Sequence, residues 1–142
     1  MLIYFRALRL DVPGKKILQI NEKYYLADHG IREAVYGYNE RDIELVLENI
    51  VCLELLRRNY DVYSGRIGDK EIDFIAKRGN ECIYIQVCYL LAMEETIERE
   101  FGIYNSIPDN FPKYVLSMDE FNLGRNGILH KNIREFLMAE SW

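Results

Sequence analysis

One long apolar segment, Leu45-Val46-Leu47-Glu48-Asn49-Ile50-Val51-Cys52-Leu53-Glu54-Leu55-Leu56, lies near the middle of the chain. On a helical wheel it is apolar on more than one side, which predicts a central helix over 41–58. Short runs rich in β-branched and aromatic residues follow, separated by glycine-containing turns. They predict strands over 60–66, 71–77 and 81–89. An α/β domain organised around this segment is therefore expected.

The flanking sequence supplies further elements of the same domain. Upstream, a Pro13-Gly14 turn predicts a β-hairpin over 1–20, and Asp28 and Gly37 frame a short helix. Downstream, the predicted elements are an amphipathic helix over 92–101, a strand over 113–118 parallel to its neighbour, a short strand at 128–130 and a helix over 133–140. We expect an α/β fold, a mixed sheet flanked by helices. The predicted domains are 1–22, a hairpin appendage, and 23–142, the main domain.

Composition narrows the classes of protein to which the chain can belong. Its 142 residues carry a net charge of −5, so no global field draws it to nucleic acid. The cysteines are odd in number and lie in apolar runs, which favours buried thiols in a reducing compartment. No signal peptide or membrane helix is apparent, so we expect a soluble, cytoplasmic protein. Because the chain opens inside the predicted hairpin, we expect residue 1 not to be the natural start of the polypeptide.

Three polar side chains, Glu48, Asp73 and Gln86, stand where apolar residues would be easier to bury. Glu48 lies in the apolar stripe of the 41–58 helix, where a carboxylate is costly to desolvate without a partner. Alternation predicts one strand face with Ile72, Phe74 and Ala76 and the other with Glu71, Asp73 and Ile75. Asp73 and Gln86 then lie side by side on neighbouring strands, with Cys88 two residues on. If the helix covers that face, Glu48 joins them.

Two interpretations of Glu48 stay open at this point. It is either a carboxylate bonded to an arginine or a backbone group, or a carboxylate aimed at a metal ion or a reacting group. Other patterns add little, because His29 and His130 have no metal-ligand spacing and no Ser-His-Asp order is apparent.

Together, Glu48, Asp73 and Gln86 resemble the core of the PD-(D/E)xK nucleases: a helix with Glu, a strand with Asp, and a hairpin to a strand with (E/Q)-x-K. The resemblance implies a restriction-endonuclease-like fold in which Asp73, Gln86 and Glu48 hold Mg²⁺ and a lysine steadies the attacking water. The sequence departs from the pattern because Gln86 is neutral and Cys88 stands in the lysine position. The catalytic set is then degenerate: Glu48, Asp73, Gln86 and Cys88. Lys70 is the nearest candidate for a relocated lysine, although alternation puts it on the opposite face.

A resemblance that covers almost the whole chain rests on segments such as Lys23-Tyr24-Tyr25-Leu26-Ala27-Asp28-His29-Gly30 and Asp69-Lys70-Glu71-Ile72-Asp73-Phe74. They are similar to the C-terminal domain, of no assigned function and nuclease-like, of a family of prokaryotic AAA-type ATPases. The resemblance implies an ATPase domain N-terminal to this segment, with a winged-helix-like segment between them of which the hairpin is a remnant. No GxxxxGK[ST] occurs, so this chain has no ATP site of that kind.

The sequence therefore predicts an accessory or regulatory domain of an AAA-type ATPase with a degenerate nuclease-like site and little or no nuclease activity. One alternative is an active Mg²⁺-dependent nuclease with a relocated lysine, and another is a protein-interaction or dimerisation module. The expected partner is the ATPase domain, with nucleic acid and a second copy as further candidates and no membrane. The basic residues of the hairpin form either a solvated face or a docking strip: Arg6, Arg9, Lys15 and Lys16.

Overall fold

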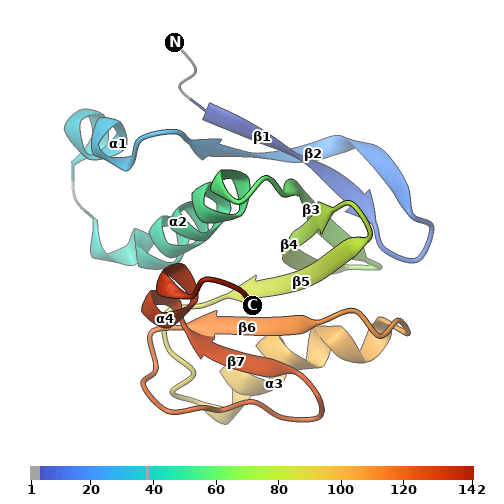
Figure 1. The fold of residues 1–142 in the computed structure, drawn as a ribbon. Coiled ribbons are helices and arrows are strands. Elements are labelled where there is room, and N and C mark those ends of the chain that lie inside the picture. The colour runs from blue at the N-terminus through green and yellow to red at the C-terminus, as the bar shows by residue number, and fades with distance from the viewer. Residues whose placement is uncertain (1–3, 38) are drawn as a thin grey trace.

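The computed structural model describes residues 4–37 and 39–142, and within these ranges the chain forms a seven-stranded mixed sheet (Figure 1). The strand order is β2-β1-β3-β4-β5-β6-β7. The strands are β1 (Tyr4–Asp11), β2 (Lys16–Leu26), β3 (Asp61–Ile67), β4 (Lys70–Arg78), β5 (Glu81–Val87), β6 (Lys113–Ser117) and β7 (Leu129–Asn132). The predicted α/β architecture with a mixed sheet is confirmed, while residues 1–3 of the predicted hairpin lie outside the described ranges.

Helices cover both faces of the sheet. They are α1 (His29–Tyr36), α2 (Ile43–Arg57), α3 (Glu94–Gly102) and α4 (Ile133–Met138), with the 3-10 turns η1 (Glu40–Asp42) and η2 (Ile103–Ser106). Figure 1 shows α2 and α4 in front of the sheet and α3 behind it. One core, which includes Val51, Leu55 and Phe136, packs against α2 and α4. The other, which includes Ile97 and Phe101, packs against α3. The sheet thus has a separate hydrophobic core on each side.

The central helix forms where the apolar segment predicts it. It begins as η1, where the Asn39 side chain accepts a hydrogen bond from the Arg41 N–H, and continues as α2 to Arg57. Its buried residues are Leu47, Asn49, Val51, Cys52 and Leu55. Asn59 then adopts a left-handed backbone with φ of 62°, which asparagine tolerates better than most residues. This turn directs the chain from α2 into β3.

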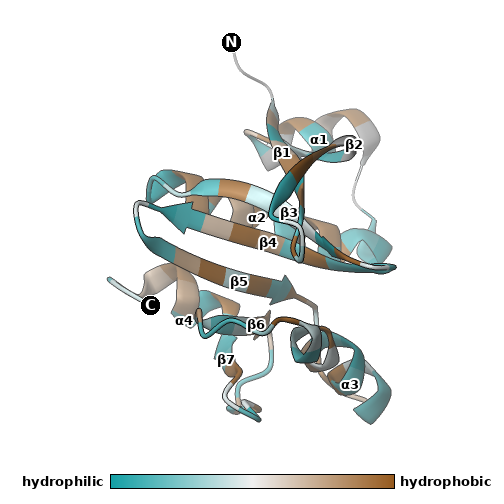
Figure 2. Ribbon diagram, turned by 90° about the vertical axis from the view of Figure 1, so that its right-hand side faces the viewer, coloured by the Kyte–Doolittle hydropathy of each residue, from teal (hydrophilic) through white to brown (hydrophobic). Residues whose placement is uncertain are grey.

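The middle of the sheet has the predicted topology. β3, β4 and β5 are antiparallel neighbours, and β6 returns through α3 to lie parallel to β5. Figure 2 shows the centres of β4 and β5 as hydrophobic, as expected for strands covered on both faces. β7 then adds to the edge, parallel to β6.

The N-terminal hairpin is part of this sheet and not an appendage. β1 pairs antiparallel with β2, as predicted, but it also pairs parallel with β3. Ala7 and Leu10 of β1 are buried in the cores on the two sides. The predicted boundary between 1–22 and 23–142 falls inside β2, which runs unbroken through a bulge opposite Ala7–Arg9. β2 loses its register with β1 between Leu18 and Lys23, around that boundary, but continues as one strand to Leu26.

A bulge in β4 decides which side chains face α2. Where β3 advances by two residues, β4 advances by three, from Ile75 to Ile72. Ile72 and Ile75 consequently both pack in the α3 core, while Phe74 packs in the α2 core. The predicted alternation, with Ile72 and Phe74 on one face, was wrong because the bulge inserts one extra residue. The insertion leaves Asp73 on the same side as Phe74, towards α2.

Two further findings concern membrane helices and the state of the cysteines. Within the described residues, no helix is long and apolar enough to cross a membrane. Cys52, Cys82 and Cys88 are buried, free thiols, as predicted.

Candidate functional site

Lys23 joins three carboxylates at one point on the α2 side of the sheet. Its Nζ lies 2.7 Å from Oε1 of Glu71, 2.9 Å from Oε1 of Glu48 and 3.4 Å from Oδ1 of Asp73. Lys23 comes from β2, Glu48 from α2, and the other two from β4. These four residues, called the ion-pair cluster below, therefore tie three elements together.

Glu48 is held from β2 by two side chains that alternate along the strand. Besides Lys23, the Tyr25 hydroxyl donates a hydrogen bond of 2.5 Å to Oε1 of Glu48. The next residue of α2, Asn49, bonds the backbone of Leu26 twice, at 2.8 Å to its N–H and 3.0 Å to its carbonyl oxygen. Only 13% of the Glu48 side chain is exposed. The apolar stripe of α2 thus accommodates a carboxylate because β2 supplies its donors.

Asp73 and Gln86 lie where the backbone ladder between β4 and β5 ends. The last regular pair is Phe74 with Ile85. Beyond it, the Asp73 carboxylate accepts a hydrogen bond of 2.9 Å from the Val87 N–H. The Gln86 side chain in turn accepts one of 3.1 Å from the Asp73 N–H. These side chains replace the missing ladder bonds, so both have a structural partner.

The electrostatics of the cluster follow from its burial. Burial, reinforced by the nearby charge of Glu48, raises the pKa of Asp73 to about 7. Burial alone would lower the pKa of Lys23, but the surrounding carboxylates outweigh it and raise that pKa above its ordinary value. Arg9 also reaches Glu71, with Nη2 2.7 Å from Oε2. Two cations thus face three carboxyl groups, one of which gains a proton near neutral pH.

The oxygen atoms of the cluster suit Mg²⁺ in kind but not in arrangement. Carboxylate oxygens are ligands that this ion prefers. However, the Lys23 ammonium occupies the point that the three carboxylates share. Among the described residues, no group of three or more His, Cys, Asp and Glu side chains is arranged to hold a metal ion. The arrangement does not fit a divalent ion while Lys23 stays in place. Mg²⁺ binding by Asp73, Gln86 and Glu48 would require Lys23 to move away, and it stays a prediction.

The structure brings together most, but not all, of the predicted site. Glu48 and Asp73 meet at Lys23, and Gln86 bonds the Asp73 backbone. Cys88 lies elsewhere, in the α3 core, with Sγ 3.9 Å from the carbonyl oxygen of Leu116. Burial, and to a smaller extent the charge of Glu100, raises the pKa of the Cys88 thiol, so the thiol stays neutral. The predicted position of Cys88 beside the other three residues is therefore not observed.

The lysine of the cluster is Lys23, a residue that the sequence interpretation did not single out. Lys70, the expected donor, is exposed at the start of β4. The overlooked signal is the alternation of Lys23 and Tyr25 on one face of β2, both able to donate to a carboxylate. Arg9 was likewise assigned to a basic surface strip, yet it is buried and paired with Glu71.

A second polar group links Ser117, Asp119 and His130 at the ends of β6 and β7. Ser117 Oγ lies 2.7 Å from Oδ2 of Asp119 and 2.8 Å from Nε2 of His130. The Leu123 N–H donates to Nδ1 of His130 at 3.1 Å, so the proton of the neutral ring is on Nε2 and points at Ser117. Because His130 donates to the serine, it cannot act as its base. The group is structural, despite its likeness to a hydrolase triad.

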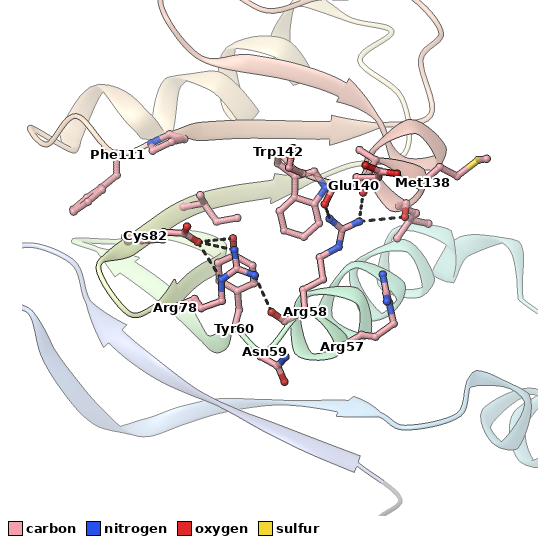
Figure 3. Close-up of a pocket in the computed structure, with 16 residues that line it drawn as sticks. Arg57, Arg58, Asn59, Tyr60, Arg78, Cys82, Phe111, Met138, Glu140 and Trp142 are labelled. Carbon is pink, nitrogen blue, oxygen red and sulfur yellow. Dashed lines mark hydrogen bonds and ion pairs between the residues drawn. The ribbon is translucent and has the colours of Figure 1, made fainter.

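Two cavities of the described chain lie on or beside α2. One, of about 300 Å³, is lined by Lys23, Tyr24, Arg32, Leu45 and Glu48 among others and opens onto the ion-pair cluster. The other, of about 760 Å³, lies at the far end of α2 and is shown in Figure 3. Solvent therefore reaches the cluster through the smaller cavity, while the larger one is separate from it.

Comparison with known proteins adds one relative. An uncharacterized protein of Haemophilus influenzae is 37% identical over 115 residues, which cover 81% of this chain and 28% of that protein. The chain thus spans little more than a quarter of the relative it matches. No protein-family profile matches the chain, and neither does any solved structure.

Proposed function

We propose that this chain is a restriction-endonuclease-like accessory domain of an AAA-type ATPase, with a degenerate nuclease-like site that does not cleave nucleic acid. The observation that carries the proposal is the ion-pair cluster. Lys23 occupies the point where Glu48, Glu71 and Asp73 meet, so the protein neutralises these groups with its own cations.

The arrangement of elements supports the nuclease-like fold. A helix with Glu48 packs on a mixed sheet in which antiparallel β4 and β5 carry Asp73 and Gln86. The two strands separate where these side chains lie, which gathers polar groups at one end of the sheet. Such convergence is what the PD-(D/E)xK resemblance implies. The neutral Gln86 and the absence of a basic residue at Cys88 support the degenerate character of the site.

The accessory role is supported by the size of the Haemophilus influenzae relative. Because the match covers 28% of that protein, 72% of it lies outside the matched region and leaves room for an ATPase domain. Reading the gene upstream of this segment tests the assignment. We expect an in-phase reading frame with a GxxxxGK[ST] motif. An upstream frame without a P-loop would remove the ATPase from the proposal.

Lack of cleavage is tested by incubating the protein with plasmid, single-stranded and branched DNA in Mg²⁺ and in Mn²⁺. We expect no cleavage by the wild type or by Asp73→Asn. Millimolar Mg²⁺ should leave the melting temperature of the wild type unchanged. In Lys23→Met the three carboxylates are left facing each other, so divalent ions should raise the melting temperature of that variant. Wild-type cleavage that disappears in Asp73→Asn would refute the proposal.

A second function, an active Mg²⁺-dependent nuclease, is favoured by one specific observation. Lys23 Nζ lies 3.4 Å from Oδ1 of Asp73, so Lys23, and not Lys70, is the lysine that this alternative would use. In that case Lys23 would move towards the substrate when a metal ion binds the carboxylates, and its positive charge would stabilise the transition state. Losing such a group costs about 10²–10³ in rate. The alternative therefore predicts cleavage that falls by this factor in Lys23→Met and is unchanged in Lys70→Met.

A further inference from the structure

A cavity lies where α2 ends, β5 begins and the residues after α4 fold back (Figure 3). Its volume of about 760 Å³ falls within the range of about 300–1,000 Å³ that is usual for ligand pockets. Its walls combine apolar and aromatic side chains with arginines, among them Tyr60, Ile83, Phe111, Trp142, Arg57 and Arg78. This cavity, called the α2-end groove below, plays no part in the ion-pair cluster.

A short length of β5 backbone opens onto the α2-end groove. β6 pairs with β5 from Tyr84, whose N–H donates to the carbonyl oxygen of Pro112 at 3.0 Å. One pair earlier, the parallel ladder would require an N–H at residue 112 to donate to the Cys82 carbonyl, and proline has none. Within the described residues, neither the N–H nor the carbonyl of Cys82 on this side has a protein partner. Pro112 thus leaves one donor and one acceptor of a strand edge open in the groove.

The aromatic wall of the groove is fixed by stacking. The guanidinium of Arg58 lies 4.1 Å from the centre of the Trp142 ring, and that of Arg78 lies 4.4 Å from the Tyr60 ring. Trp142 also stacks on Phe136 at 4.0 Å and donates its indole N–H to the Phe136 carbonyl at 2.8 Å. A wall held in this way is formed before a ligand arrives, which reduces the entropy lost on binding.

The rim of the groove exposes apolar and cationic side chains. Phe111 is 43% exposed and Met138 is 85% exposed. Arg57 is bonded to Glu54 through Nε and Nη2, but its side chain is largely exposed. This pair is bidentate and only 10% of the Glu54 side chain is exposed, so it stays in place. Nη1 of Arg57, which has no protein partner among the described residues, is the group that can donate to a carboxylate on a ligand.

We propose that the α2-end groove binds a short extended peptide of a partner protein, apolar and acidic in character. The peptide backbone pairs with the N–H and carbonyl of Cys82 in the place that β6 leaves open, an addition to a strand edge. An apolar side chain packs between Phe111 and Trp142, and an acidic one pairs with Arg57. The donor–acceptor pair on a strand edge favours a peptide over a nucleotide. The C-terminal ends of α2 and α4 at the groove present carbonyl oxygens, which cannot donate hydrogen bonds to a phosphate.

The intrinsic fluorescence of the protein reports directly on this groove, because Trp142 is its single tryptophan. The probe is the capped tetrapeptide acetyl-Glu-Leu-Phe-Glu-amide, titrated at low and high salt. Its matched controls are the same peptide with N-methylated central amides and a version with lysine in place of glutamate. We expect saturable binding of the first probe, roughly three- to tenfold weaker for the N-methylated one, as for the loss of one or two hydrogen bonds. The lysine version should bind more weakly still.

Variants separate the contributions of the wall and the strand edge. Phe111→Ala and Arg57→Ala should weaken binding, whereas Phe121→Ala, a change of an exposed ring outside the groove, should not. Pro112→Ala supplies the N–H that would close the ladder over Cys82, so it should weaken binding without loss of stability. Pro108→Ala is its control. Equal binding of the N-methylated peptide, or tighter binding of adenosine monophosphate than of the peptide, would overturn the proposal.

Discussion

Lys23 is the residue on which the polar interior depends most. Its ammonium neutralises carboxylates from α2 and β4, two of which, Glu48 and Asp73, are only 13% and 14% exposed. Removing one partner of a buried ion pair leaves uncompensated charge, which costs about 3–5 kcal/mol. Lys23 keeps a quarter of its side chain in solvent, so we expect Lys23→Met to lower the free energy of unfolding by about 3 kcal/mol, the lower end of that range.

Urea denaturation at pH 7.5 measures this effect. Lys70→Met is the matched control, because Lys70 is exposed and its loss should change the free energy of unfolding by no more than about 0.5 kcal/mol. Adding Asp73→Asn to Lys23→Met should recover part of the loss, since it removes one of the unpaired carboxylates. Equal stabilities of the two lysine variants would show that the cluster contributes nothing to the fold.

His130 predicts a pH dependence of stability. Burial lowers the pKa of its imidazole below the ordinary value of about 6.5, and Nδ1 must stay unprotonated to accept the Leu123 N–H. The unfolded chain therefore binds a proton more readily than the folded one. This contribution to stability is fully present above pH 6.5 and is lost as the pH falls from there towards the native pKa.

The measurement is the free energy of unfolding between pH 7.5 and 5 for the wild type and for His130→Asn. The difference between the two should shrink as the pH falls, because the variant lacks the titrating ring. Asp73, whose pKa is raised, titrates with the opposite sign over part of this range, so the comparison with the variant is essential. A difference independent of pH would mean that the ring binds protons equally in both states.

At the scale of residues, the sequence identified the site residues that break a local pattern and missed the site residues that do not. Glu48 interrupts an apolar stripe and Asp73 stands in a strand, so both were identified. Lys23 is a lysine in a polar part of an edge strand, which is an ordinary solvated position by any local criterion. Its role depends on the approach of α2 and β4, 25 and 50 residues away in the chain. The predicted position of Cys88 beside the other site residues was wrong for a different reason. It was taken from the nuclease pattern and not from the residues around Cys88.

At the scale of elements, Gly65 of β3 explains how the β4 bulge is accommodated. It pairs with Ile72, and a Cβ at this position would lie 2.8 Å from Cδ1 of Ile75 and 3.2 Å from Cβ of Ile72. We expect Gly65→Ala to destabilise the protein by about 1–3 kcal/mol, as overpacking in a core does. Gly102→Ala is the control, because nothing lies within 4 Å of its added Cβ. Chemical denaturation of both variants tests this, and a neutral Gly65→Ala would show that the bulge relaxes easily.

The elements themselves were largely predictable, but the bulge was not. Caps and turns are local signals: Asp28 caps α1, Asn132 caps α4, and Gly68 and Gly79 take positive φ in the turns beside β4. A bulge is a mismatch between two strands, so no single strand carries its signature. The prediction from alternation therefore put Ile72 on the wrong face of the sheet, although it identified β4 and both of its neighbouring strands.

At the scale of the whole molecule, the hairpin of β1 and β2 determines how far the sheet extends. The sequence predicted a loosely attached appendage because the parallel pairing of β1 with β3 has no local sequence signal. In the structure that pairing joins Leu8 to Tyr63 and Asp11 to Arg66, and the Val12 N–H continues it with a bond of 2.9 Å to the Arg66 carbonyl. The buried Ala7 and Leu10 anchor β1 to both cores.

We therefore expect β1 to open together with the centre of the sheet. Amide hydrogen exchange measured by mass spectrometry in mild denaturant should show the peptide over residues 4–12 exchanging with the same free energy of opening as the peptide over 113–117. Within residues 4–37 and 39–142, β2 has a neighbouring strand on one side only, so its outward amides should exchange faster. The Leu26 amide is the exception, because the Asn49 side chain holds it, and Asn49→Ala should expose it selectively. Exchange of residues 4–12 by an early, separate opening would show instead that the hairpin is an independent unit docked on the sheet.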